Sequence, residues 1–122
     1  AEDAVRAALA DSDCTMVSRN AGSGTRVIID QLLGARRPPG YGVQTRSHNA
    51  VAAAVAQGRA DWGVAIDTVA RAYGLAFLPL REERYDFVVP KTRLERPAVR
   101  AFRAVLDDAG TRAELKALGF LV

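Results

Sequence analysis

The chain contains 122 residues, of which 49% are hydrophobic and 25% are charged, and its formal net charge at pH 7 is +3. This length and composition correspond to about one globular domain with a sizeable core, and they argue against a disordered chain. The single cysteine, Cys14, excludes an internal disulfide, and the single histidine, His48, excludes a multi-histidine zinc site. The lysines and arginines are spread along the chain, so the mildly basic charge suits a small anion as well as a nucleic acid.

The first part of the chain alternates between segments typical of strands and of helices. A helix over residues 1–11 comes first. Three strand–helix pairs follow, with strands predicted at 14–18, 41–46 and 62–66 and helices at 25–33, 48–57 and 67–73. Gly34, Gly58 and Gly74 are expected to end these helices. Cys14 falls in the first strand, where we expect an inert core thiol.

The second part of the chain is predicted to contain two more strands, at 75–80 and 84–89, followed by two helices. One of these helices begins at Pro97, a favoured residue for a first helical position, and the other spans 111–118. Alternation of this kind predicts an α/β fold with a mostly parallel sheet covered by helices on both faces. No apolar stretch reaches the length needed to span a membrane.

The segment SRNAGSGTR, residues 18–26, joins the first strand to the next helix. In a parallel sheet such turns gather at one edge, where the unpaired N–H groups of helix N-termini attract anions. Its glycines let the backbone approach a ligand, and its hydroxyls can donate hydrogen bonds. The candidate ligand residues of this turn are Gly22, Ser23, Gly24 and Thr25. A similar turn, Thr45-Arg46-Ser47-His48, opens the next helix and is expected on the same edge.

Ordinary structural roles would also explain these residues. Helix capping accounts for the serines and the threonine of the two turns, and Asp67 is expected to cap the third helix. Arg19 and Arg26 are expected on the surface or in ion pairs with Asp30 or Asp61. The first turn is not a P-loop, because no lysine follows its glycines, and it lacks the third glycine of a dinucleotide-binding fingerprint.

Three stretches resemble a known family: SRNAGSGTR, TRSHNAVAAAVAQGRADWGVAI and GLAFLPLREERYDFVVP. They are similar to the periplasmic-binding-protein-like domain attached to MoeA-like proteins of molybdopterin biosynthesis and to helix-turn-helix regulators. That domain is related to molybdate- and tungstate-binding proteins and, more distantly, to the effector domains of LysR-type regulators. The resemblance covers residues 14–120, which is nearly the whole chain.

The resemblance implies a type II binding-protein fold, in which two α/β lobes close on a ligand. Residues 14–80 would form one complete ligand-binding lobe after an N-terminal helix or linker at 1–13. Residues 81–122 would supply the crossover strand and C-terminal helices of the partner lobe. The first half of that lobe would precede residue 1, so we expect this chain to be the C-terminal part of a longer protein.

The resemblance also implies a function: binding of a small oxyanion, with molybdate or tungstate favoured, as a sensor or substrate-binding module of a larger protein. The expected ligand-binding residues are Gly22, Ser23, Gly24, Thr25, Arg26, Ser47, His48 and Asp67. No catalytic residue, metal or cofactor is expected. The expected partners are a fused or missing N-terminal DNA-binding or MoeA-like domain and a second copy in a homodimer. We expect no membrane association and a cytoplasmic location, with the periplasm as the alternative.

Other functions stay open on the sequence alone. The ligand can be a small organic molecule, as in LysR-type regulators, or the chain can be an interaction module that binds no ligand. An enzyme acting on phosphate groups would need a general base, for which Asp61, Asp67 and His48 are available. That alternative lacks a nucleophile with a base and an orienting residue.

Overall fold

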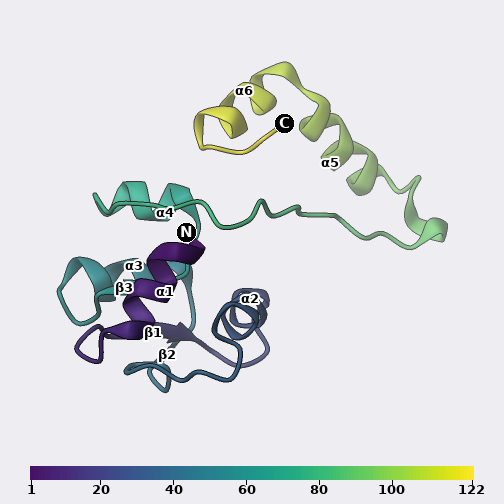
Figure 1. Ribbon diagram of the computed structural model, residues 1–122. Helices are drawn as coiled ribbons and strands as arrows, with labels where there is room; N and C mark the ends of the chain where they lie inside the picture. Colours follow the sequence, from purple (N-terminus) through teal and green to yellow (C-terminus); the bar gives the residue numbers. More distant parts are fainter. The chain divides into compact units, whose positions relative to one another are not determined.

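A small parallel β-sheet organises the N-terminal part of the protein. The computed structural model describes residues 1–122, and its contacts divide them into unit 1, Ala1–Arg81, and unit 2, Glu82–Val122. Unit 1 contains the strands β1 (Met16–Arg19), β2 (Gln44–Thr45) and β3 (Trp62–Gly63) (Figure 1). The strand order is β2-β1-β3 and both pairs are parallel, so β1 lies in the middle of the sheet.

The hydrogen-bond ladder fixes β1 as the central strand. Arg19 is paired with Thr45 of β2, and Met16 is paired with Trp62 of β3. Just beyond β1, the Asn20 N–H donates to the Thr45 carbonyl at 2.9 Å. Because β1 has a neighbour on each side, all four of its residues are buried.

Four helices accompany the sheet: α1 (Glu2–Ala10), α2 (Gly24–Leu33), α3 (His48–Ala56) and α4 (Asp67–Ala72). On one face, Ile29 and Leu33 of α2 pack with Met16. On the other face, Val51 of α3 packs with Val17, because successive residues of a strand point to opposite sides. The predicted α/β fold, with helices on both faces of a parallel sheet, is therefore confirmed.

Two predicted strands are absent. Residues 75–80 and 84–89 form no strand, and they run as an extended chain in Figure 1. No backbone N–H group from residue 76 to residue 89 donates to a backbone carbonyl. A strand exists through the ladder that it shares with a neighbour, and this chain supplies no neighbour for these residues. β2 and β3 are also shorter than predicted, at two residues each.

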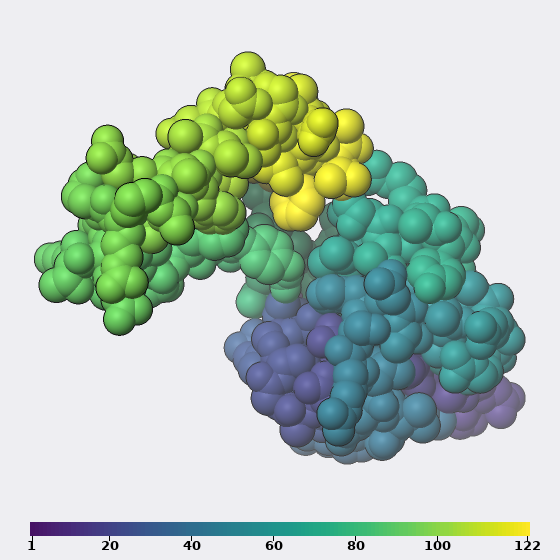
Figure 2. Space-filling view, turned by 180° about the vertical axis from the view of Figure 1, so that it is seen from behind, coloured from purple at the N-terminus to yellow at the C-terminus, as the bar shows by residue number.

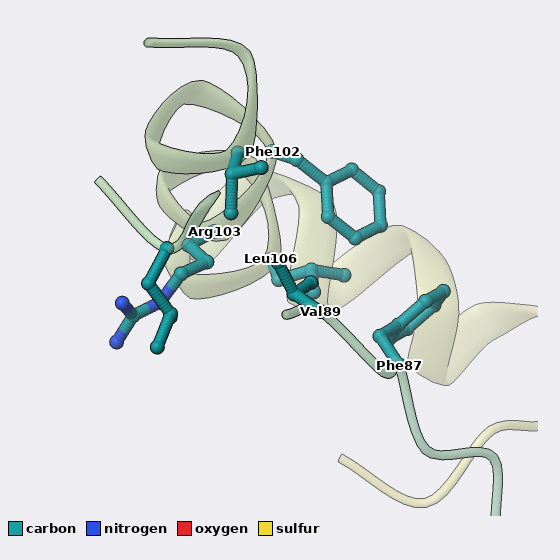
Figure 3. Close-up of a pocket in the computed structure, with 7 residues that line it drawn as sticks. Phe87, Val89, Phe102, Arg103 and Leu106 are labelled. Carbon is teal, nitrogen blue, oxygen red and sulfur yellow. The ribbon is translucent and has the colours of Figure 1, made fainter. Parts of the chain in front are cut away.

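Unit 2 has an apolar face but no closed core. It contains a short 3₁₀ turn, η1 (Lys91–Arg93), and the helices α5 (Pro97–Asp107) and α6 (Ala109–Ala117). Neither helix, shown in green to yellow in Figure 2, has a buried residue. A hollow of about 250 Å³ is lined by Phe87, Val89, Leu94, Val99, Phe102, Arg103 and Leu106. The rings of Phe87 and Phe102 meet edge to face there, with centroids 5.0 Å apart (Figure 3). A helix with the length and hydrophobicity needed to span a lipid bilayer is absent from the structure.

We expect the protein to self-associate through α5. Phe102 and Val105 are exposed by 44% and 53%, and contiguous apolar surface of this kind drives association. The protein should bind the dye ANS and sediment as a concentration-dependent oligomer, with a two-fold dimer as the simplest closed form. Val105→Glu should weaken both signals, whereas Lys116→Gln, which changes the charge equally on α6, should leave them unchanged. A monomer that binds no ANS would contradict this expectation.

Candidate functional site

The turn after β1 presents free backbone N–H groups at a helix start. Gly22 has a φ of +89°, a conformation that favours glycine. Ser23 is the N-cap of α2, and its Oγ accepts a hydrogen bond from the Arg26 N–H at 3.1 Å. The N–H groups of Gly24 and Thr25 donate to no atom of the chain. They are therefore available to an anion at the N-terminus of α2.

Arg19 lies at the carboxyl end of β1 and is buried, with only 9% of its surface exposed. The expectation of a surface or ion-paired arginine is wrong, because β1 is the central strand and because no carboxylate forms an ion pair with Arg19. Its Nη1 lies 3.4 Å from Thr25 Oγ1, in the first turn of α2, and its Nε has no hydrogen-bond partner. A buried cation directed at the positive end of a helix is unfavourable unless an anion joins them.

More polar atoms in and beside β1 are buried without a partner. Ser18 is fully buried, and its Oγ makes no hydrogen bond. The same holds for the Oδ1 atom of Asn20, which follows β1, and for the Nε1 atom of Trp62 in β3. Buried polar groups normally have a partner. A polar ligand bound near β1 could therefore form hydrogen bonds with buried polar atoms that have no partner in the chain.

Arg26, a predicted ligand residue, is held in contacts within the chain. Its side chain is 12% exposed, and its Nε donates to Asp30 Oδ1 at 3.1 Å. Its Nη1 donates to the Arg19 carbonyl at 2.8 Å, and its Nη2 donates to the hydroxyl of Tyr41. That hydroxyl donates in turn to Asp30 Oδ1 at 2.7 Å. Of the two ion pairs considered for Arg26, the one with Asp30 is formed.

The hydrogen bonds of this cluster change the titration of Asp30. The Tyr41 hydroxyl, and after it Arg26, hold the pKa of the Asp30 carboxyl below its ordinary value. The Tyr41 hydroxyl is also the main cause that raises the pKa of Arg26. Because the folded pKa of Asp30 is lowered, its contribution to stability is present above its ordinary pKa and is lost as the pH falls through the folded value.

The second predicted turn lies beside the first. Ser47 is the N-cap of α3, and its Oγ accepts a hydrogen bond from the Ala50 N–H at 3.0 Å. His48 is the first residue of α3. Because β2 runs parallel to β1 and the Asn20 N–H bonds to the Thr45 carbonyl, both turns leave the same edge of the sheet. The prediction of a common edge is confirmed.

Asp67 does not cap α4, contrary to the prediction. The N-cap is Ile66, whose backbone is extended, and Asp67 is the first helical residue. Its Oδ2 forms an ion pair with Arg71 Nη2 at 2.8 Å. An acidic residue in the first turn suits the helix dipole without capping. Asp67 follows β3 and so belongs to the same edge, but an ionised carboxylate only accepts hydrogen bonds and repels anions.

Cys14 and Asp61, two side chains that could take part in chemistry, lie near the start of β1. The prediction that Cys14 lies in the first strand is wrong: β1 begins at Met16, so Cys14 precedes the strand and is partly exposed. Burial, and after it Asp61 and Asp11, raise the pKa of the Cys14 thiol, which disfavours the thiolate. Asp61 Oδ2 accepts a hydrogen bond from the Thr15 N–H at 2.7 Å, which fixes the segment before β1. No group of three or more His, Cys, Asp or Glu side chains is placed to hold a metal.

The parallel sheet, with two helix N-termini and a buried arginine at its carboxyl edge, is typical of α/β domains that bind small ligands there. The chain belongs to the periplasmic-binding-protein-like (PBP) superfamily, whose domain model matches residues 5–107. The predicted family is confirmed at this level.

Two relatives illustrate the membership. The chain is 33% identical over 112 residues to the uncharacterized protein YvgK of Bacillus subtilis (strain 168), a match that covers 88% of this chain but only 36% of YvgK. It is 31% identical over 81 residues to the uncharacterized protein in the 5′ region of the 2Fe-2S ferredoxin gene of Clostridium pasteurianum, covering 66% of this chain and 72% of that protein. No solved structure matches the chain.

Proposed function

We propose that this chain is a non-catalytic domain that binds a small oxyanion at the carboxyl edge of its sheet. The observation that carries the proposal is Arg19, a residue that is 9% exposed, forms no ion pair and reaches Thr25 in the first turn of α2. A buried charge that has no opposite charge beside it is costly. A bound anion would pair with this guanidinium and accept hydrogen bonds from the Gly24 and Thr25 N–H groups.

Molybdate and tungstate are the favoured ligands within this proposal. One support is the resemblance of the turn sequences to the domain found with MoeA-like proteins. Another is the chemistry of the edge, because backbone N–H groups and Arg19 are donors, and both dianions present only acceptors at pH 7. Phosphate is partly protonated near neutral pH, so at a site made of these donors alone it should bind more weakly. Tight binding of phosphate would require an acceptor such as Asn20 Oδ1.

The domain would act as a sensor or substrate-binding module beside a DNA-binding or MoeA-like domain, in the cytoplasm. The resemblance supports this role. In YvgK the matched segment is 36% of the protein, which supports a part played within a longer chain. The full gene sequence around this domain would show which other domain is fused to it.

An anion screen tests the proposal. Melting temperatures measured with molybdate, tungstate, sulfate and phosphate at constant ionic strength should rise, and they should rise most with the first two. Arg19→Gln should lose the response, whereas Arg59→Gln, which removes an exposed arginine, should keep it. An unchanged melting temperature with every anion would overturn the proposal. If phosphate binds more tightly than molybdate, a function linked to phosphate or nucleotides becomes the better assignment for the domain.

A second ligand class is favoured by Asn20. Its Oδ1 is a buried acceptor without a partner, one residue after Arg19. A small organic acid could place its carboxylate at the guanidinium and donate from a hydroxyl or amino group to Asn20. Small hydroxy- and amino-carboxylates belong in the same thermal screen. If they stabilise the protein more than the oxyanions do, a LysR-like effector domain becomes the better assignment.

Ser23 allows capping to be separated from anion binding. Aspartate caps helices as well as serine does, so Ser23→Asp should keep the free energy of unfolding within about 0.5 kcal/mol of the parent. Its negative charge beside the Gly24 and Thr25 N–H groups should lower the affinity for molybdate at least about tenfold. Urea denaturation and calorimetric titration measure the two quantities. Equal affinities of the variant and the parent would place the anion elsewhere.

A further inference from the structure

We infer that Tyr41 is a positioning residue for the anion site, because through Arg26 it fixes the end of β1 that carries the Arg19 guanidinium. The inference rests on the proposed function and assigns a role to residues outside the turn itself. Tyr41 would not touch the anion. It would hold the donors of the turn in place before the anion arrives.

The first step of the argument is the set of contacts made by Arg26. Each of its three side-chain nitrogens donates within the chain: Nε to Asp30, Nη1 to the Arg19 carbonyl at 2.8 Å and Nη2 to the Tyr41 hydroxyl. Its backbone N–H is bonded to Ser23 Oγ. Arg26 therefore connects the last residue of β1 to the first turn of α2 through hydrogen bonds. All three nitrogens of its side chain are used in contacts within the chain.

The second step is the position of Tyr41. Its hydroxyl accepts a hydrogen bond from Arg26 and donates one to Asp30. Because Arg26 also donates to Asp30, the three side chains are all hydrogen-bonded to one another. The Arg26 guanidinium carbon lies 4.4 Å from the centre of the Tyr41 ring, a cation–π contact. The ring also packs against the Met16–Ile29–Leu33 cluster. Tyr41 is thus anchored in the core and presents a fixed partner to the arginine.

The third step is the attachment of the segment before Tyr41 to the sheet. The Met16 N–H donates to the Pro39 carbonyl at 2.8 Å, and Gly40 lies against the Met16 carbonyl. Tyr41 therefore moves with β1. Without its hydroxyl, Arg26 would lose one partner and Asp30 would lose a donor, and the Arg19 carbonyl would be held less firmly. An anion would then have to order the turn as it binds, which weakens affinity.

The test compares Tyr41→Phe with Arg37→Gln. Arg37 lies over the same ring, with its guanidinium carbon 4.6 Å from the centre, but its hydrogen bonds go to the Gly34 and Arg36 carbonyls. Amide hydrogen exchange is measured by NMR in the ligand-free protein, and the affinity for molybdate is measured by calorimetry. Tyr41→Phe should speed exchange several-fold at the bonded amides of the turn. It should weaken molybdate binding roughly tenfold, the effect of about one charge-assisted hydrogen bond. Arg37→Gln leaves both hydrogen bonds of the Tyr41 hydroxyl in place, so it should change both quantities much less than Tyr41→Phe does.

The bonded amides to follow are those of Asn20, Ser23 and Arg26, and the amide of Asp61, bonded to the Thr15 carbonyl before β1, reports on unit 1 away from the turn. Faster exchange at all four amides alike would mean general destabilisation and would overturn the inference. Unchanged exchange in the turn, or equal molybdate affinity, would also overturn it. If the parent binds none of the anions, the proposed function fails. The exchange pattern then still supports or overturns the ordering of the turn by Tyr41.

Discussion

Replacing Arg19 with methionine is expected to stabilise the free protein and to remove its affinity for anions. Methionine has a similar length but no charge, so its burial beside Thr25 requires no desolvation of a guanidinium. Replacing buried charged groups with hydrophobic residues of similar volume is neutral or stabilising, and here we expect a gain of about 1–3 kcal/mol in the free energy of unfolding. Urea denaturation of the parent and the variant measures this gain.

The same substitution should weaken molybdate binding by about 3–5 kcal/mol, which corresponds to more than about a hundredfold in Kd. Arg19→Lys is the informative control, because it keeps the charge but loses the planar fork of donors, and it should bind with intermediate affinity. A methionine variant that is less stable than the parent and binds molybdate equally well would show that Arg19 serves only the fold.

Gly40→Ala is expected to destabilise unit 1 by at least about 3 kcal/mol. Gly40 has a φ of +89°, and a Cβ atom there would lie 1.7 Å from the Met16 carbonyl oxygen. A backbone atom cannot rotate away, so the segment has to leave β1 and break the bond between the Met16 N–H and the Pro39 carbonyl. The loss of ellipticity on urea titration measures the effect.

Gly22→Ala provides the matched control for this experiment. Gly22 has the same φ of +89°, but nothing lies within 4 Å of the position of its missing Cβ. Its substitution should therefore cost only the strain of a positive φ, about 1–2 kcal/mol. Equal losses for the two variants would mean that the segment around Gly40 does not pack against β1.

The helices of unit 1 could be predicted closely because their ends depend on local signals. Ser23 and Ser47 accept hydrogen bonds from N–H groups three residues later, and Gly34 ends α2 with a positive φ. Each signal lies within a few residues of the helix end that it determines, so no tertiary information is needed. The glycines and hydroxyls of the first turn could be picked out as site candidates for the same reason.

The features that depend on distant parts of the chain could not be predicted. The burial of Arg19 follows from the strand order, which places β2 and β3 on either side of β1. The role of Arg26 depends on Tyr41, fifteen residues away, so its side chain looks like an exposed turn arginine in the sequence. The strands expected at 75–80 and 84–89 have β-like composition but no partner, and composition alone does not form a ladder.

Because β1 has only four residues, the candidate site and the core of unit 1 depend on the same short strand. Its four residues supply Met16 to one hydrophobic cluster, Val17 to the other, and Arg19 to the candidate site. Fraying of this strand would open both clusters and the site together, because β1 contributes residues to all three. Unfolding of unit 1 then removes the site, so an anion that binds the site should also make unit 1 more resistant to proteases.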